Sequence, residues 1–365
     1  MKIPFNKSTV VGNELEYIKD AIDRSHISGN GYYSKKCVNF FQEKYGFGKC
    51  LLTTSCTDAL EMSAVLLDLK PGDEVIVPAF TFVSTANAYT LHGGKVVFAD
   101  SKDNNPNICP KSIRSKITKN TRAICIVHYA GYACDMDEIL EICKEHNLVL
   151  IEDAAQAIDS FYKGRALGSF GDFATFSFHE TKNISSGEGG MLVVNNSEFY
   201  DRSEIIWEKG TNRAAFKRGD VQKYECVDVG ASYLLSELNA AYLWGQVEKL
   251  EVVTAKRKEI WDYYYNEVFK LGYFNLPEKE EGKDYNGHLF FLTIDSNKRS
   301  ELISNLADQD ISTSFHYLSL ESSPYYNAGK SCTNAIRFEK EILRLPIYYS
   351  MRIEDYKKVI DCLSK

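Results

Sequence analysis

The segment Phe173-Ala-Thr-Phe-Ser-Phe-His-Glu-Thr-Lys182-Asn183 reads as an apolar strand that runs into a polar turn carrying one lysine. The glycine-rich stretch Ile-Ser-Ser-Gly187-Glu-Gly189-Gly190 follows it. A lysine held at the end of a strand can form a Schiff base with an aldehyde. Upstream, a second apolar run, Leu148-Val-Leu-Ile-Glu-Asp153, ends in a carboxylate. The two runs together predict an amine and a carboxylate at the ends of two strands.

Enzymes that use pyridoxal phosphate (PLP) need this pair of groups. An amine holds the cofactor aldehyde, and a carboxylate keeps the ring nitrogen protonated. Taken singly, Lys182 would be an ordinary solvated lysine and Asp153 a residue that caps the end of a strand. Because both occur in one chain in this setting, Lys182 and Asp153 are the candidate catalytic residues.

Short apolar strands alternate with amphipathic segments from about residue 50 to residue 195. Strands are expected at 51–53, 74–77, 95–98, 122–127, 148–151 and 173–178, and helices at 58–69, 84–91 and 135–147. This alternation predicts an α/β fold with a mainly parallel sheet and helices on both faces. Sites in such sheets lie at the carboxyl ends of the strands, which is where Asp153 and Lys182 fall.

The pattern changes after about residue 232. Long helices are expected at 236–248 and 252–269, a strand at 288–294, and further helices at 298–308 and after Ile353. A chain of 365 residues is longer than one hydrophobic core usually serves. We therefore predict a large cofactor-binding domain over residues 1–245 and a smaller α+β C-terminal domain over residues 246–365.

Composition narrows the class of protein further. The net charge of -7 disfavours a general binder of nucleic acid or of anionic membranes. No apolar stretch approaches the roughly 20 residues that span a bilayer, and the N-terminus has no signal core. The ten cysteines form no C-x-x-C pair, so no metal site is expected. Reduced thiols in a cytoplasmic protein are the simplest account of them.

Further residues near these strands have both a functional and an ordinary interpretation. The turn Ser55-Cys-Thr57 opens a helix, where free backbone N–H groups bind phosphate or are simply capped. Gln156, on the turn after the carboxylate, could reach a cofactor ring oxygen or be a surface amide. Ser177 could bind phosphate or be a buried serine. Phe82 could stack on a flat ring or lie in the core.

Together these motifs resemble the sugar-nucleotide aminotransferases of the DegT/DnrJ/EryC1/StrS family, over nearly the whole chain. The stretches that carry the resemblance are Pro71-Gly-Asp-Glu-Val-Ile-Val-Pro78, Thr81-Phe-Val-Ser-Thr-Ala-Asn87, Glu152-Asp-Ala-Ala-Gln156 and Ser177-Phe-His-Glu-Thr-Lys-Asn183. The resemblance implies the type I PLP-dependent fold of aspartate aminotransferase and a transaminase activity.

The resemblance also implies a role for each candidate residue. Lys182 would form the Schiff base, and Asp153 would pair with the pyridine nitrogen. Other cofactor contacts would come from Ser55, Cys56, Thr57, Phe82, Gln156 and Ser177, and substrate contacts from Lys209, Arg213, His316 and Tyr317. Asn212 would reach the cofactor phosphate of a neighbouring subunit. A homodimer with shared active sites is therefore expected.

The substrates implied are glutamate and a nucleotide sugar. In the stretches Tyr162-Lys-Gly-Arg-Ala-Leu-Gly168 and Glu208-Lys-Gly-Thr-Asn-Arg213 the chain resembles family members that aminate C4 of dTDP-4-keto-6-deoxyglucose. This resemblance implies dTDP-4-amino-4,6-dideoxygalactose as the product. Such a product would serve cell-surface polysaccharides such as enterobacterial common antigen or the O-antigen of lipopolysaccharide. The alternatives are C3 amination of a dTDP-3-keto-6-deoxyhexose and a non-enzymatic sugar-binding or regulatory protein. A sugar dehydratase is disfavoured, because such relatives replace the lysine with histidine.

One loop departs from the family pattern. Relatives commonly read His-Tyr-x-Pro-Leu-His, whereas this chain has His316-Tyr-Leu-Ser319-Leu-Glu321. Glu321 is expected to be anionic near neutral pH, unlike a histidine. If this loop faces the sugar or its diphosphate, the substrate pose would differ.

Overall fold

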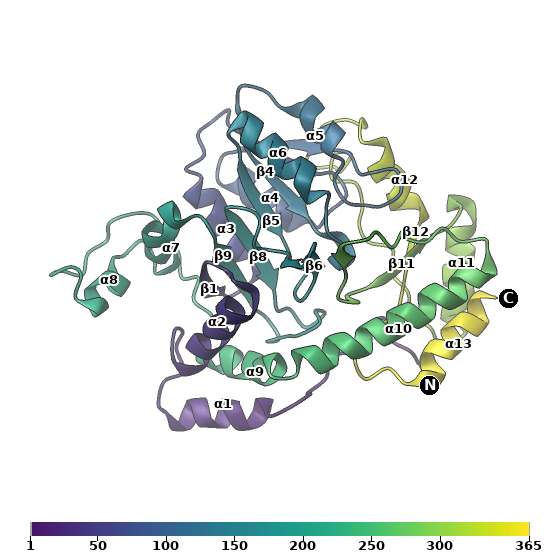
Figure 1. Ribbon diagram of the computed structural model, residues 1–365, viewed down its shortest axis with the longest axis horizontal. Helices are drawn as coiled ribbons and strands as arrows, with labels where there is room; N and C mark the ends of the chain where they lie inside the picture. Colours follow the sequence, from purple (N-terminus) through teal and green to yellow (C-terminus); the bar gives the residue numbers. More distant parts are fainter. Residues whose placement is uncertain (1, 365) are drawn as a thin grey trace.

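A seven-stranded sheet forms the centre of the computed structural model, which describes residues 2–364 (Figure 1). The strand order is β1-β9-β8-β5-β4-β2-β3. The strands are β1 (Lys49–Thr53), β2 (Glu74–Pro78), β3 (Lys95–Ala99), β4 (Thr121–Val127), β5 (Val149–Asp153), β8 (Phe173–Ser177) and β9 (Gly190–Val194). β9 is antiparallel to both of its neighbours, and the other pairs are parallel. The predicted mainly parallel sheet is confirmed.

Both faces of this sheet are buried, and alternate side chains enter different cores. In β2, Val75 and Val77 join one apolar cluster, whereas Ile76 joins the other. In β4, Cys125 joins the first of these clusters and Ile124 joins the second. This is why the strands read as continuous apolar runs in the sequence rather than as an alternation of apolar and polar residues.

The first 250 residues also form helices, most of which pack on the two faces of the sheet. They are α1 (Glu14–Asp23), α2 (Tyr32–Tyr45), α3 (Cys56–Leu66), α4 (Val83–Leu91), α5 (Pro110–Lys116), α6 (Met136–His146), α7 (Tyr200–Trp207), α8 (Arg213–Arg218) and α9 (Glu237–Val247), with 3-10 turns at Tyr129–Gly131 and Ser197–Phe199. Leu60 of α3 and Tyr89 of α4 pack on one face. Phe41 of α2, Ile139 of α6 and Leu243 of α9 pack on the other.

The C-terminal part is built on the long helix α10 (Leu250–Leu271). Its antiparallel strands are β11 (Phe290–Thr293) and β12 (Ile342–Leu345), and its other helices are α11 (Ser296–Asp308), α12 (Thr333–Glu341) and α13 (Ile353–Leu363). The division into domains at residue 245 stays a prediction; that residue lies in the last turn of α9. Within residues 2–364, no helix is long and apolar enough to cross a membrane.

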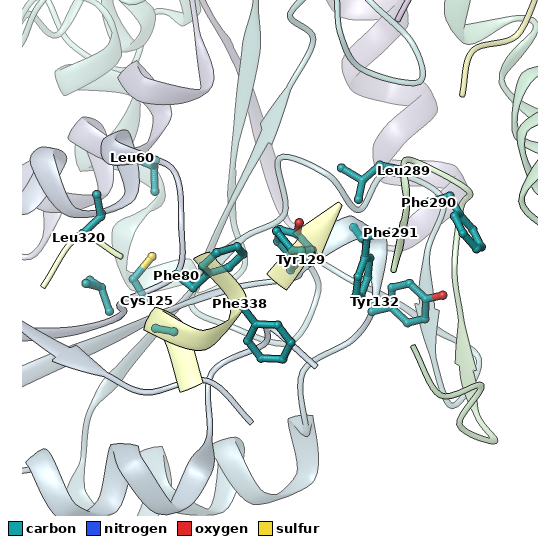
Figure 2. Close-up of a cluster of buried hydrophobic side chains, with 14 of the residues drawn as sticks. Leu60, Phe80, Cys125, Tyr129, Tyr132, Leu289, Phe290, Phe291, Leu320 and Phe338 are labelled. Atoms are coloured by element: carbon teal, nitrogen blue, oxygen red, sulfur yellow. The ribbon is translucent and has the colours of Figure 1, made fainter. Parts of the chain in front are cut away.

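Aromatic side chains join the C-terminal elements to the sheet (Figure 2). The Tyr129 ring lies 5.5 Å from Phe80, which follows β2, and 5.4 Å from Phe291 of β11. The Phe338 ring of α12 also lies 6.1 Å from the Phe80 ring. A small sheet also crosses between the two parts, because β10 (Lys283–Asp284) pairs with β6 (Phe161–Tyr162), which pairs with β7 (Arg165–Ala166). The C-terminal elements are thereby held against the carboxyl edge of the central sheet.

Candidate active site

A cavity of about 500 Å³ lies at this junction. It takes side chains from the ends of β5 and β8, from the start of α3, and from the C-terminal part. Of the residues predicted from sequence, those that line it are Ser55, Cys56, Thr57, Phe82, Asp153, Gln156, Ser177, Lys182, His316 and Tyr317. The structure therefore brings together in one place residues that are up to 262 positions apart in the chain, from Ser55 to Tyr317.

Asp153 is the last residue of β5 and is 5% exposed. One carboxylate oxygen accepts a hydrogen bond from the Thr85 hydroxyl at 2.7 Å, and the other accepts from the Ala155 N–H at 3.2 Å. Burial raises the pKa of Asp153, while these hydrogen bonds and the charge of Lys182 lower it. A buried carboxylate held in this way is suited to pair with a protonated ring nitrogen.

Lys182 follows β8 on a short turn, in which its N–H donates to the His179 carbonyl at 2.9 Å. Burial lowers the pKa of the Lys182 amine, and the nearby Cys56 thiol and Asp153 carboxylate raise it. Arg344 lowers it further. Because the neutral amine is the nucleophile towards an aldehyde, a depressed pKa favours the chemistry predicted for this lysine.

The start of α3 fits a phosphate group. Ser55 caps this helix by accepting from the Asp58 N–H at 3.0 Å, and Ser55, Cys56 and Thr57 at the helix start line the cavity. A side chain at Gly190 would collide with the backbone of Ser55 and Cys56, so glycine permits β9 to approach the helix start. Ser177, which pairs with Gly190 between β8 and β9, also lines the cavity. Backbone donors at a helix N-terminus favour an anion there.

Gln156 connects two walls of the cavity. Its side-chain carbonyl accepts from the Ala130 N–H at 2.6 Å, and its amide donates to the Tyr317 hydroxyl at 2.9 Å. The Tyr317 ring lies 5.9 Å from the ring of Phe82, which is 54% exposed. Gln156 and Phe82, which are predicted to contact the cofactor ring, therefore both contact Tyr317, the predicted substrate residue.

Sequence reasoning missed three basic cavity residues from the C-terminal part: Arg257, His288 and Arg344. The Arg257 guanidinium donates to the carbonyls of Gly287 and His288, and burial lowers its pKa to about 10. Burial also lowers the pKa of His288 far below its usual range, so its imidazole is neutral. The signal available for Arg344 was a single charge inside the apolar strand Ile342-Leu-Arg-Leu345.

Three other predicted residues lie elsewhere. Lys209, Asn212 and Arg213 belong to the segment 208–232, which we call the arm; it carries α8 and extends away from the central sheet (Figure 1). The Asn212 side chain donates to the Lys223 carbonyl at 3.1 Å and accepts from the Glu225 N–H at 2.8 Å. None of the three is among the described residues that line the cavity. Their predicted roles stay predictions.

The loop that departs from the family pattern turns away from the cavity after Tyr317. Glu321 is 3% exposed, and its carboxylate accepts from the Ser331 hydroxyl at 2.6 Å and the Cys332 N–H at 2.8 Å. The Ser319 N–H donates to the Glu339 carboxylate at 2.9 Å. Glu321 is not among the described residues that line the cavity, and its carboxylate is bonded within the loop instead.

Known proteins with the same arrangement identify the family. Residues 9–364 match the DegT/DnrJ/EryC1/StrS aminotransferase family. The GDP-perosamine synthase of Escherichia coli O157:H7 is 34% identical over 325 residues, which cover 89% of this chain and 87% of that protein.

Solved structures agree with this match. The aminotransferase TlmJ from Streptoalloteichus hindustanus superposes with a TM-score of 0.94 at 27% identity, covering 100% of this chain and 98% of that one. The putative sugar aminotransferase Spr1654 from Streptococcus pneumoniae, in its PLP form, gives a TM-score of 0.91 at 25% identity, covering 100% and 98%.

These matches confirm the predicted aminotransferase fold, the transaminase activity and the PLP cofactor. They leave the individual site residues as predictions that rest on the geometry described above. The chain belongs to the DegT/DnrJ/EryC1/StrS aminotransferase family.

Proposed function

We propose that this protein transfers the amino group of glutamate to C4 of dTDP-4-keto-6-deoxyglucose, giving dTDP-4-amino-4,6-dideoxygalactose. The observation that carries the proposal is the convergence of Lys182 and Asp153 on one cavity in a member of an aminotransferase family. Bound PLP supplies an electron-poor ring that takes up the electron pair released when a C–H bond next to nitrogen breaks.

Each residue of the cavity named below has a separate role in the proposed reaction. Asp153 holds a proton on the ring nitrogen, and Thr85 orients the carboxylate through its 2.7 Å hydrogen bond. Lys182 carries a proton from the donor carbon and later delivers one to the sugar carbon, as a general base and acid. Ser177 and the first N–H groups of α3 bind the phosphate. Phe82 and the wall formed by Gln156 confine the ring.

The sugar is assigned on chain-wide similarity. The E. coli relative is named GDP-perosamine synthase, which describes an amino sugar linked to a nucleoside diphosphate. This name supports a nucleotide-linked substrate for the present chain. The dTDP moiety and the C4 position rest on the stretches Tyr162–Gly168 and Glu208–Arg213. His316 and Tyr317 would contact the sugar, and the product would enter a cell-surface polysaccharide. A cytoplasmic location fits the ten free thiols.

We further propose that the active unit is a homodimer. Asn212 of one subunit would reach the cofactor phosphate in the other, and Lys209 and Arg213 would contact the substrate diphosphate there. Apolar side chains of the arm support this: Phe216, Tyr224, Val227 and Val229 are 46%, 53%, 51% and 65% exposed. A second copy would cover such side chains, which a lone chain leaves in water.

The decisive experiment is incubation with nitrogen-15 glutamate and a panel of keto-sugar nucleotides, followed by NMR of the products. The panel should contain dTDP-4-keto-6-deoxyglucose, its 3-keto isomer and a GDP-linked 4-keto sugar. The proposal predicts a labelled amine at C4 of the dTDP sugar with galacto configuration. Amination of the 3-keto isomer alone would overturn the C4 assignment. Absence of both labelled sugar and 2-oxoglutarate would favour the non-enzymatic alternative.

A further inference from the structure

The imidazole of His288 lies in the cavity and is neutral. His288 precedes β11, is 7% exposed and is among the residues that line the cavity. Burial lowers its pKa far below the usual range, and the nearby charges of Lys182, Arg257 and Arg344 lower it further. A neutral imidazole has one ring nitrogen that donates a hydrogen bond and one that accepts.

Two asparagines determine which ring nitrogen of His288 carries the proton. The Asn183 amide nitrogen donates to the Asn286 backbone carbonyl at 3.0 Å. The Asn183 side-chain oxygen lies 3.0 Å from Nδ1 of His288. Because an amide oxygen only accepts, Nδ1 carries the proton and Nε2 carries the lone pair. The ring therefore offers a single acceptor, at Nε2.

This acceptor is open to the cavity. Within residues 2–364, the hydrogen bonds of His288 are made by its backbone and by Nδ1. Nε2 makes none, yet it is not among the enclosed side-chain atoms that lack a partner, so part of its surface is open. Since His288 lines the cavity, a donor in the cavity can reach Nε2.

Of the three cationic side chains that act on His288, Lys182 has uncommitted N–H groups that can move. Arg257 donates to two backbone carbonyls. Arg344 donates through Nε to a tyrosine hydroxyl, and its unpartnered Nη2 is enclosed. The hydrogen bond that Lys182 donates within residues 2–364 comes from its backbone N–H. Lys182 also adjoins Asn183, the residue that holds the His288 ring, and its flexible stem can turn its amine towards Nε2.

Two other acceptors near Lys182 are less suited to hold its amine. The Asp153 carboxylate is bonded to Thr85 and Ala155 and is the partner proposed for the ring nitrogen of the cofactor. The Cys56 sulfur is a weak acceptor, and burial raises the pKa of its thiol, which stays uncharged. The imidazole nitrogen is the stronger acceptor that is left.

We propose that His288 is a positioning residue whose Nε2 accepts a hydrogen bond from the Lys182 ammonium when that lysine is free of the cofactor. In the proposed reaction the Lys182 amine takes a proton from the donor carbon, becomes an ammonium group and later gives a proton to the sugar carbon. The hydrogen bond holds the charged side chain in one place between the two transfers, and no covalent bond changes at His288. The inference rests on the proposed transamination and adds a residue that acts through Lys182.

Two substitutions separate this role from a purely structural one. His288→Gln keeps an acceptor at about the position of Nε2 but loses the bond from Nδ1 to Asn183. His288→Asn keeps a donor at about the position of Nδ1 but loses the acceptor at Nε2. If the ring only supports the fold, His288→Asn should be the milder change. If Nε2 holds Lys182, His288→Gln should be the milder change.

The first test measures the Lys182 amine in full-length protein freed of its cofactor. The pH dependence of the rate of PLP capture reports the neutral fraction of the amine, because only the neutral amine attacks the aldehyde. An acceptor for the ammonium stabilises the charged form. The neutral fraction at pH 7 should therefore be about tenfold higher in His288→Asn than in wild type, and unchanged in His288→Gln.

The control for this test is His146→Asn, at the exposed last residue of α6, which should behave as wild type. Cys56, Asp153 and Arg344 also act on the pKa of Lys182, and they are the same in every variant. A wild-type pH dependence of PLP capture in a folded His288→Asn protein would overturn the inference.

The second test uses the holoenzyme and a single turnover with glutamate deuterated at the donor carbon. In His288→Asn the cofactor band should convert about tenfold more slowly at an unchanged half-saturating glutamate concentration. The deuterium isotope effect should increase, because proton transfer becomes the slow step. His288→Gln should stay near wild type in both respects. Equal losses in the two variants with an unchanged isotope effect would contradict the inference and leave the ring a structural role.

The two tests separate this inference from the proposed function. If glutamate does not convert the wild-type band, the assignment of glutamate as donor fails, while PLP capture still tests the contact between His288 and Lys182. If glutamate converts the band and His288→Asn captures PLP as wild type does, the transamination is supported and this inference fails. Where His288→Asn does not fold, His288→Gln decides: wild-type capture supports the inference, and an altered pH dependence contradicts it.

Discussion

The cavity at the carboxyl edge of the sheet and the arm at residues 208–232 both carry predicted functional residues, but the chain holds them in different ways. Asp153 ends a central strand, is buried, and is bonded to Thr85 and Ala155. Asn212 is bonded only to backbone groups of its own arm, at Lys223 and Glu225. The cavity residues converge within one chain, whereas the arm residues are proposed to gain a target through a second copy.

The largest expected effect comes from the lysine of the cavity. Lys182→Ala should lower turnover by about a thousandfold or more, because it removes both the amine and the general acid–base group. The matched change Lys217→Ala, on α8 of the arm, should leave turnover within about twofold. Steady-state rates with glutamate and the keto sugar measure both. Substantial turnover by a folded Lys182→Ala protein would contradict the account of the cavity.

Asp153→Asn should have the next largest effect. The amide keeps the shape of the side chain but loses the negative charge, so the ring nitrogen loses its proton and the rate should fall about a hundredfold. Cofactor affinity should fall with it, as measured by release of PLP on dilution. Asp201→Asn, a change at an exposed residue of α7, is the control. Near-normal turnover in a folded Asp153→Asn protein would remove the aspartate from the proposed mechanism.

The arm can be tested by mixing two impaired proteins. Lys182→Ala and Asn212→Asp should each be impaired alone, the second by repulsion between the new carboxylate and the phosphate. After subunit exchange, about a quarter of the sites should be intact, since half of the dimers are mixed and each mixed dimer has one native site. Demonstrated exchange with no recovery would show that each site is built within one chain.

The smallest effect on catalysis is expected at the loop that departs from the family pattern. Glu321→Gln should leave both Michaelis constants unchanged, because the carboxylate bonds to Ser331 and Cys332. It should destabilise the fold by about 1 kcal/mol near neutral pH, through loss of charge-assisted hydrogen bonds. A lowered Michaelis constant for the sugar would contradict this placement.

The same variant has a predicted pH dependence. Burial alone would raise the pKa of Glu321, but hydrogen bonds from Ser331 and Cys332 lower it below the usual 4.5. A depressed folded-state pKa stabilises the protein fully above the unfolded value of 4.5, and this contribution is lost as pH falls through the folded value. The difference in melting temperature between wild type and Glu321→Gln should therefore be constant at neutral pH and shrink in acid.

The sheet and the position of the candidate pair Asp153 and Lys182 at its edge were predictable because their signals are local. Each strand is a short apolar run; Asp153 is the last residue of one such run, and Lys182 lies in the turn that follows another. The helices α1 and α2 were not predicted, although Tyr33, Cys37, Phe41 and Tyr45 recur at helical spacing in α2 and are buried. Strand β9 was also missed; its first residue is a glycine of the glycine-rich stretch, which reads as a turn although Met191–Val194 are fully buried.

The placement of Arg257 and Arg344 in the cavity lining could not be predicted from the sequence in the same way. Arg344 acquires its environment from Tyr129, 215 positions earlier, and Arg257 from the carbonyls of Gly287 and His288. These contacts depend on how β12 and α10 pack against the carboxyl edge of the sheet. A charge within an apolar strand marks a residue as unusual, but only the packing shows which group it meets.

The most direct measurement of the central claim is borohydride reduction of the purified holoenzyme followed by peptide mass analysis. Reduction fixes the cofactor to the amine that holds it. The account predicts a single pyridoxyl phosphate adduct on Lys182, within the peptide that spans Ser177–Asn183. An adduct on a different lysine, or a holoenzyme that yields no adduct at all, would contradict the assignment of Lys182 and with it the comparison between the cavity and the arm.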